Sequence, residues 1–203
     1  FSLEAAKQLD QIGVELFKIG SGEFTDLPTL EGIAKLGKPM ILSTGMSKEE
    51  EIIETHNFLI NKVDSLSFLN CVSEYPPVYE DINLNYISRM KELFPKLIIG
   101  HSDHTPDLFT SFAAVSLGAK IIEKHVILDK RTKGPDQSVS IDFDDLRQLC
   151  DGIRKIEVSL GRSRKVHDLE KSIREWAFRS VVSIKNIKKG EVLSNENIWS
   201  KRP

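Results

Sequence analysis

The chain has few cysteines, no excess of basic charge and no long apolar run, and each shortage excludes a class of protein. Its two cysteines, Cys71 and Cys150, have neither CxxC nor metal-finger spacing, which excludes a disulfide scaffold or zinc finger. Both lie in apolar periodic segments, so we expect buried, reduced thiols and a cytoplasmic protein. With a formal net charge of −2 and both signs interspersed, the chain has no basic face for nucleic acid.

Membrane and dinucleotide-binding signals are missing too. No stretch approaches the ~20 consecutive apolar residues that a membrane span needs, so no membrane partner is expected. The opening residues FSLEAAKQLDQIG have the pattern of an amphipathic helix ending at Gly13 rather than of a signal peptide. No Gly-rich phosphate fingerprint follows any apolar run, which weakens the alternative of an open doubly wound sheet.

What the chain does contain is a repeated alternation of short apolar runs with segments of helical periodicity. Runs too apolar to face water on either side, separated by helices, indicate a parallel α/β architecture. We expect strands at 15–20, 39–44, 66–71, 97–102 and 120–125, and helices at 27–36, 48–60, 84–94, 108–117 and 143–160.

Polar residues follow every expected strand. This pattern resembles the C-terminal face of a (β/α)8 TIM barrel, where such enzymes have their active sites. A barrel has eight units, so residues 1–160 are predicted to be its last five, and the first residue, Phe rather than Met, agrees with a fragment. The polar residues are Lys18 and Ser21, Ser43 and Thr44, Asn70, Ser73 and Tyr75, Ser102 and His104, and His125.

Two of these residues, His104 and His125, form a candidate metal site. They follow neighbouring expected strands joined by one helix, so they should lie at the same edge of the sheet. One histidine at a strand end is more often a hydrogen-bonded structural residue. Two together can hold a divalent ion, Mn²⁺ or Mg²⁺, and leave positions for water and a substrate oxygen. His56 and His167 are expected to be solvated.

The character of the sequence changes after Gly161. Residues 161–178 are charged and helix-prone, and we expect a linker there. Residues 179–203 alternate short β-branched runs with a turn at Lys189-Gly190, and they are too few to make a core of their own. This β unit is therefore expected to continue or to dock elsewhere.

Several motifs together resemble the sialic acid synthase family. The resemblance implies a (β/α)8 barrel joined by a linker to a small antifreeze-like (SAF) domain, of which 179–203 would be the start. It also implies condensation of phosphoenolpyruvate with an N-acetylated aldose such as N-acetylmannosamine, and a domain-swapped homodimer. Members with neuraminate, legionaminate and pseudaminate products share the motifs, so the sugar stays open. The motifs are FKIGSGEFTDLP at 17–28, ILSTGMS at 41–47, NCVSEYPP at 70–77, GHSDHT at 100–105, IIEKHVILDKRTKGPD at 121–136 and RSVVSIKNIKKGE to KRP at 179–203.

The resemblance also implies roles for single residues. His104 and His125 match the family's metal ligands. Lys18 and Ser21 match its KIxS phosphate motif, and Ser73 stands where some relatives have Asn. With Ser102, these residues provide the donors that a phosphate and a carboxylate need.

The implied catalytic acids are Glu23, near the reacting carbons, and Asp136, at the sugar hydroxyls. Tyr75 and Arg202 match sugar contacts, and Arg202 would act on the partner subunit. The other polar residues have structural interpretations. Glu123 and Asp103 are expected to orient imidazoles or backbone, His101 to lie beside the site or at the surface, and Asp26, Asp129 and Asp142 to be turn or cap residues.

Two other functions remain open from the residues alone. Lys18 at a strand end suits a Schiff-base aldolase, provided that it is desolvated and free of anionic ligands. The chain also suits a non-catalytic, carbohydrate-binding barrel.

Overall fold

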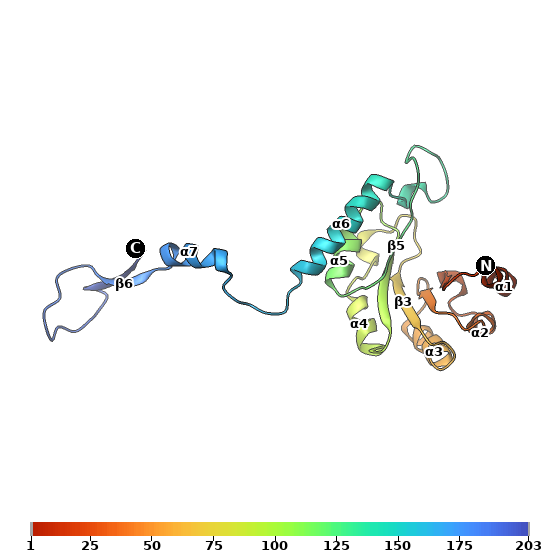
Figure 1. The fold of residues 1–203 in the computed structure, drawn as a ribbon, viewed down its shortest axis with the longest axis horizontal. Coiled ribbons are helices and arrows are strands. Elements are labelled where there is room, and N and C mark those ends of the chain that lie inside the picture. The colour runs from red at the N-terminus through yellow and green to blue at the C-terminus, as the bar shows by residue number, and fades with distance from the viewer. Residues whose placement is uncertain (1, 203) are drawn as a thin grey trace. The chain divides into compact units, whose positions relative to one another are not determined.

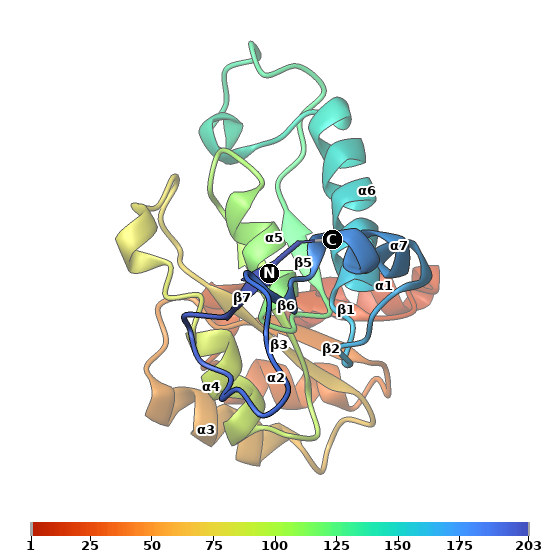
Figure 2. The ribbon, with the colours of Figure 1, turned by 90° about the vertical axis from the view of Figure 1, so that its left-hand side faces the viewer.

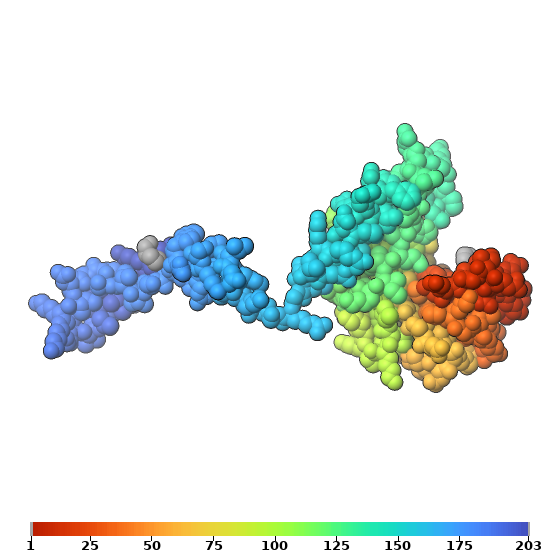
Figure 3. Space-filling model, viewed as in Figure 1, coloured from red at the N-terminus to blue at the C-terminus, as the bar shows by residue number. Residues whose placement is uncertain are grey.

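The computed structural model describes residues 2–202, which form two compact units divided after Leu160 (Figure 3). The first unit contains one sheet of five parallel strands, in the order in which they occur in the chain (Figure 1). This confirms the expected parallel α/β half-barrel. The strands are β1 (Phe17–Ile19), β2 (Met40–Ser43), β3 (Leu66–Cys71), β4 (Ile98–Asp103) and β5 (Ile122–Lys124).

Helices connect the strands and lie along the outer side of the sheet (Figures 1 and 2). All the expected helices are present, with ends within about two residues of the expected ones. They are α1 (Leu3–Ile12), α2 (Leu27–Ala34), α3 (Glu49–Leu59), α4 (Tyr86–Leu93), α5 (Phe109–Ser116) and α6 (Phe143–Ser159), with short 3-10 turns η1 (Ser21–Glu23), η2 (Tyr79–Asp81) and η3 (Gln137–Val139).

Capping residues set several helix ends, as the sequence predicts. The Asp26 side chain accepts from Thr29 N at 3.3 Å at the start of α2, and Asp142 accepts from Asp145 N at 2.9 Å at the start of α6. Gly13 ends α1 with a φ of 91°, a left-handed conformation that a side chain disfavours.

The main core lies between the sheet and its helices and contains a chain of aromatic rings. Phe68 of β3 packs edge-on against Phe24 and Phe94, with ring centroids 5.3 and 5.6 Å apart. His56 of α3 lies over Phe94, with centroids 4.6 Å apart. The expectation of a solvated His56 holds for only part of the side chain, because one side of the ring packs on this cluster while the residue is partly exposed.

The two cysteines differ in burial. Cys71, at the end of β3, is buried as expected, but Cys150 is exposed on α6, so that half of the expectation is wrong. The helix turns Leu149 toward the core, and its neighbour in the sequence faces away. Within residues 2–202, no helix is both long and apolar enough to cross a membrane.

The second unit consists of one helix and a two-stranded antiparallel sheet. Its elements are α7 (Asp168–Ala177), β6 (Ser180–Ser183) and β7 (Ile198–Lys201), and a turn at Lys188–Glu191 lies between the strands. Among residues 161–202 only Asn197 is buried, whereas Leu169, Val192 and other large apolar side chains are exposed. This unit thus buries no apolar core of its own.

Candidate active site

Most of the polar residues that follow the strands of the first unit meet in one pocket at the carboxyl ends of β1 to β5. Its volume is about 300 Å³, which is at the low end of small-molecule sites. Every strand or the loop after it contributes to the lining: Lys18, Gly20, Ser21, Gly22, Ser43, Met46, Cys71, Ser73, Tyr75, Ser102, His104, Glu123 and His125.

Lys18 and Glu123 form an ion pair across the pocket. Lys18 Nζ lies 3.1 Å from Glu123 Oε2 and also donates to the carbonyl oxygen of Ile19 at 2.9 Å. Ser102 Oγ donates to the other carboxylate oxygen, Glu123 Oε1, at 2.7 Å. The Glu123 carboxylate thus accepts hydrogen bonds from an ammonium group and a hydroxyl group. The same two donors can bind the anion of a substrate.

The hydroxyl groups of Ser21 and Ser73, in the loops after β1 and β3, lie against Gly45. Its backbone N–H donates to Ser21 Oγ at 3.0 Å, and a Cβ at this position would lie 2.7 Å from that oxygen. Only glycine lets the loop approach this closely. Ser43 Oγ is buried without a hydrogen-bond partner among residues 2–202. A buried hydroxyl without a partner carries a desolvation cost that an anion in the pocket removes.

The two imidazoles lie together at the β4 and β5 side of the pocket, with ring centroids 5.2 Å apart. His104 Nδ1 donates to the carbonyl oxygen of Val72 at 2.7 Å, so the lone pair is on Nε2, which accepts from the Tyr75 hydroxyl at 3.1 Å. The Tyr75 ring stacks on His104 at 4.2 Å. His125 Nδ1 lies 3.8 Å from Asp136 Oδ2.

These donors fit a divalent ion. Burial, and next the neighbouring His104, lower the pKa of His125, so the ring is neutral and able to ligate. The Val72 carbonyl accepts from His104 Nδ1 and so fixes the tautomer of the ring. In metal sites, the hydrogen-bond partner of a ligating histidine has this role. Within residues 2–202, no three His, Cys, Asp or Glu side chains group tightly enough to hold an ion alone. A two-histidine set with other positions taken by water and substrate oxygens matches Mn²⁺ or Mg²⁺.

Comparison with known proteins places the chain in a family. The profile of the NeuB family matches residues 1–165. This chain belongs to the NeuB family. The N,N'-diacetyllegionaminic acid synthase of Campylobacter jejuni is 42% identical over 100% of this chain and 62% of its own length. A pseudaminic acid synthase of the same species is 40% identical over 99% of this chain and 58% of the relative.

A solved structure agrees with the sequence match. The N-acetylneuraminic acid synthetase of Leptospira borgpetersenii, crystallised with citrate, superposes with a TM-score of 0.79 and 32% identity over 87% of this chain and 62% of that one. The sequence-based assignment to the sialic acid synthase family is thus confirmed. The chain spans about three fifths of the length of these relatives.

Most of the residues singled out from the sequence lie in the pocket of this NeuB-family chain, and three do not. Glu23 faces an adjoining hollow between α1, β1 and α2, which Lys18 also lines. Asp136 is 53% exposed beside His125. Arg202 belongs to the second unit, where its guanidinium lies 5.9 Å from the Trp176 ring centroid. The residues that line the pocket as expected are Lys18, Ser21, Ser73, Tyr75, Ser102, His104 and His125.

Sequence reasoning missed several lining residues. Ser43 is a polar residue at the end of an expected strand, and this could have identified it as a lining residue. The STGMS segment around Gly45 is a second feature of the sequence that points to this part of the pocket. Met46 lines the pocket with a φ of 62°, a strained conformation for a residue with a side chain. Cys71 was seen only as a core thiol, yet its Sγ lies 3.6 Å from Ser21 Oγ at the pocket floor.

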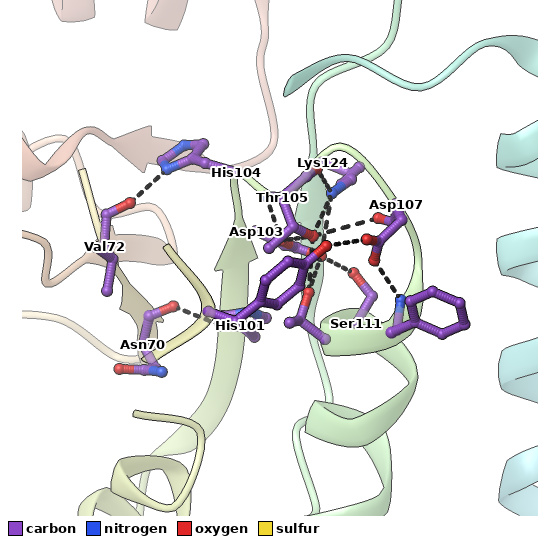
Figure 4. A network of polar contacts seen from close by, with 12 residues as sticks. Asn70, Val72, His101, Asp103, His104, Thr105, Asp107, Ser111 and Lys124 are labelled. Carbon is purple, nitrogen blue, oxygen red and sulfur yellow. Dashed lines mark hydrogen bonds and ion pairs between the residues drawn. The ribbon is translucent and has the colours of Figure 1, made fainter. Parts of the chain in front are cut away.

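Two of the three polar residues near the histidines are placed differently from expectation. Glu123 orients neither imidazole but holds Lys18 and Ser102. Asp103 faces away from His104 into a buried network (Figure 4), where Oδ1 accepts from Thr105 N at 2.8 Å, so it orients backbone as expected. His101 is only 1% exposed, with Nδ1 3.0 Å from the Asn70 carbonyl oxygen, so it is neither a surface residue nor a site residue. Strand alternation explains the last two, because positions 101 and 103 point to the helix side of β4.

Proposed function

We propose that the full-length protein is a nonulosonic acid synthase, which condenses phosphoenolpyruvate with an N-acetylated aldose such as N-acetylmannosamine and releases phosphate. The observation that carries the proposal is the meeting of an ammonium group, several hydroxyls and two imidazoles in one pocket. Membership of the NeuB family and relatives named legionaminic and pseudaminic acid synthases support it.

Phosphoenolpyruvate offers a phosphate and a carboxylate, which suit the donors of β1 to β4. Lys18 provides the charge, and its pairing with Glu123 keeps it inside the pocket until an anion takes over its hydrogen bonds. The unpartnered Ser43 hydroxyl is ready to donate. The remaining hydroxyl donors are those of Ser21, Ser73 and Ser102.

His104 and His125 would hold the divalent ion, Mn²⁺ or Mg²⁺. When bound, such an ion is a Lewis acid for a carbonyl oxygen. Tyr75 covers His104 and sits at the pocket mouth, 46% exposed, where it can contact the sugar. Asp136 is proposed to bind sugar hydroxyls, and its position beside His125 supports this role.

The proposed reaction makes one carbon–carbon bond and breaks one carbon–oxygen bond. C3 of phosphoenolpyruvate attacks the aldehyde carbon of the open-chain sugar, and the aldehyde oxygen takes up a proton. Water adds to the cationic C2 centre, losing a proton, and the tetrahedral intermediate loses phosphate by C2–O cleavage to give the ketone. Glu23, in the hollow next to Lys18, is proposed to support the positive charge at C2.

The second unit is proposed to be the start of an antifreeze-like (SAF) domain that acts on a partner subunit in a swapped homodimer, with 161–178 as linker. Its lack of an apolar core supports docking onto another surface, because exposed Leu169, Val192 and Trp199 need a partner to be buried. Arg202 would complete the sugar site of the partner. A cytoplasmic location is also proposed, since Cys71 and Cys150 are both free thiols.

The aldolase alternative is not favoured. A Schiff base needs a free amine, but the Lys18 ammonium is held by the Glu123 carboxylate and a backbone carbonyl. Nothing in the pocket favours a non-catalytic barrel either.

Product mass tests the proposal. Metal-stripped full-length protein is incubated with phosphoenolpyruvate and N-acetylmannosamine or other N-acetylated aldoses, with and without Mn²⁺. A metal-dependent product with the mass of the sugar plus pyruvate, formed with one phosphate, is expected. Turnover with pyruvate in place of phosphoenolpyruvate, indifferent to Mn²⁺ and with borohydride trapping on Lys18, would establish the aldolase instead, and no turnover with any sugar would favour a binding barrel.

A further inference from the structure

A buried polar network lies on the helix side of β4 and β5, behind the residues that line the pocket (Figure 4). Side chains alternate along each strand, so Ser102 and His104 face the pocket and Asp103 faces α5. The same holds on β5, where Lys124 lies between two lining residues. The register pairs Asp103 with Lys124 directly across the two strands.

The Asp103 carboxylate is fully satisfied there. Oδ1 accepts from Thr105 N and from Thr105 Oγ1, each at 2.8 Å, and Oδ2 accepts from Thr110 Oγ1 at 2.8 Å and Ser111 Oγ at 2.5 Å. Lys124 Nζ lies 3.1 Å from Oδ2, and the two side chains are 1% and 3% exposed. Lys124 also donates to the Thr105 carbonyl oxygen.

The network extends to the loop after β3. The Tyr79 hydroxyl donates to Asp107 Oδ2, and Asp107 Oδ1 accepts from Phe109 N at 2.9 Å. Tyr79 lies on the same loop as Tyr75, whose ring stacks on His104. The network therefore connects the β3 loop, the β4 loop and β5, which are the three elements that bring Tyr75, His104 and His125 together.

A buried ion pair contributes little net stability compared with apolar residues of the same size, because desolvation offsets the attraction. Its directional bonds, however, permit one arrangement only. A slip of β5 against β4 by one residue would turn Glu123 and His125 away from the pocket and separate Lys124 from Asp103. Ligands must be held within about 0.5 Å of the productive geometry.

We propose that Asp103 and Lys124 are positioning residues that set the metal and substrate geometry of the pocket from behind it. They fix the register of β4 and β5, so that His104 meets His125 and Ser102 meets Glu123. The inference rests on the proposed synthase function, because it assigns the pair a role in that site.

The test uses full-length Asp103→Asn, Lys124→Met and Ser111→Ala, with Met90→Ala as the control. Met90 is fully buried in the core away from the network, so its variant loses stability without disturbing the pair. For each variant, Mn²⁺ affinity is measured by a titration followed by electron paramagnetic resonance, and kcat is measured with saturating substrates. Both are measured at a temperature where the variant is folded, and the melting temperature is measured separately.

Asp103→Asn and Lys124→Met are expected to weaken Mn²⁺ binding about tenfold or more and to lower kcat by a similar factor. Ser111→Ala, which removes a single donor on α5, is expected to cause a smaller loss in both, and Met90→Ala to lower the melting temperature alone. Variants that melt earlier but keep wild-type Mn²⁺ affinity and kcat would overturn the inference. If the first two fail to fold, an unchanged Ser111→Ala overturns it. Wild-type protein that binds no Mn²⁺ and makes no condensation product would instead contradict the proposed function.

Discussion

Lys18 of β1 and Glu123 of β5 form an ion pair of 3.1 Å although they stand on the first and last strands of the sheet. Four strand spacings of about 4.8 Å would separate these strands by roughly 19 Å in a flat sheet. The pair is therefore possible only because the sheet curls, and its concave side gathers the ends of all five strands. The same pair directs the Lys18 ammonium into the pocket.

Lys18→Met is expected to raise the KM for phosphoenolpyruvate far more than that for the sugar. A charged hydrogen bond to phosphate contributes about 1.5–3 kcal/mol, so the expected change is roughly 10- to 100-fold. Steady-state kinetics of the full-length protein measure it. Lys38→Met is the matched control, since Lys38 pairs with Asp10 away from the pocket. A change in the sugar KM alone, or substrate trapped covalently on Lys18, would refute the phosphate role.

His104→Ala and His125→Ala are each expected to abolish Mn²⁺-dependent turnover and to weaken Mn²⁺ binding by roughly 100-fold or more. This loss exceeds the one expected on removing a residue that contacts only a metal ligand. Stability should fall only modestly, because His104 loses its hydrogen bonds to Val72 and to the Tyr75 hydroxyl, each worth about 1 kcal/mol. Metal titration and thermal unfolding give the two readouts. His167→Ala, in the second unit, serves as the control. Either site variant with the wild-type Mn²⁺ titration curve would exclude the site.

His101→Leu is expected to remove part of the acid sensitivity of the fold. Burial is the main cause that lowers the pKa of His101 from its ordinary value of 6.5. As the pH falls below about 6.5, the unfolded chain takes up the proton first, so the wild type loses stability until the pH reaches the lower folded pKa. Melting temperatures from pH 8 to pH 5 should therefore fall more steeply for the wild type than for the variant.

At pH 8 the His101→Leu variant should lie within about 1 kcal/mol of the wild type, since it loses only the contact with the Asn70 carbonyl. His167→Gln, at an exposed position, should keep the wild-type slope. Parallel curves for His101→Leu and the wild type would show that His101 does not titrate with unfolding.

Subunit mixing tests the swapped dimer. Full-length Arg202→Ala and His125→Ala should each be inactive, and exchange between them should restore activity, because one of the two composite sites of a mixed dimer is whole. Random exchange gives about half mixed dimers, and so about a quarter of wild-type activity. Native mass spectrometry verifies the exchange. Verified mixed dimers without activity would contradict the swapped arrangement.

The fold was predictable because its signals are local. Apolar runs such as 66–71 and capping residues such as Asp26 and Asp142 identify their elements without knowledge of their neighbours. Cys150 shows the limit of this reasoning, since helical periodicity alone does not tell which side of α6 faces the sheet.

The pocket was predictable where a polar side chain directly follows a strand, as for Lys18 and His104. Contacts between distant strands were not, because the pairing of Glu123 with Lys18 depends on how strongly the sheet curls. The ion pair of Asp103 with Lys124 was hidden for another reason. Each adjoins a histidine in the sequence, and only the alternation of β4 and β5 places them behind the site.

Phosphoenolpyruvate labelled with ¹⁸O at its bridging oxygen tests the central claim most directly. Full-length protein with Mn²⁺ and the N-acetylated aldose should release phosphate that contains the label, because water attacks C2 and the C2–O bond breaks. Unlabelled phosphate, with the label at C2 of the product, would show cleavage of the phosphorus–oxygen bond and would contradict the account.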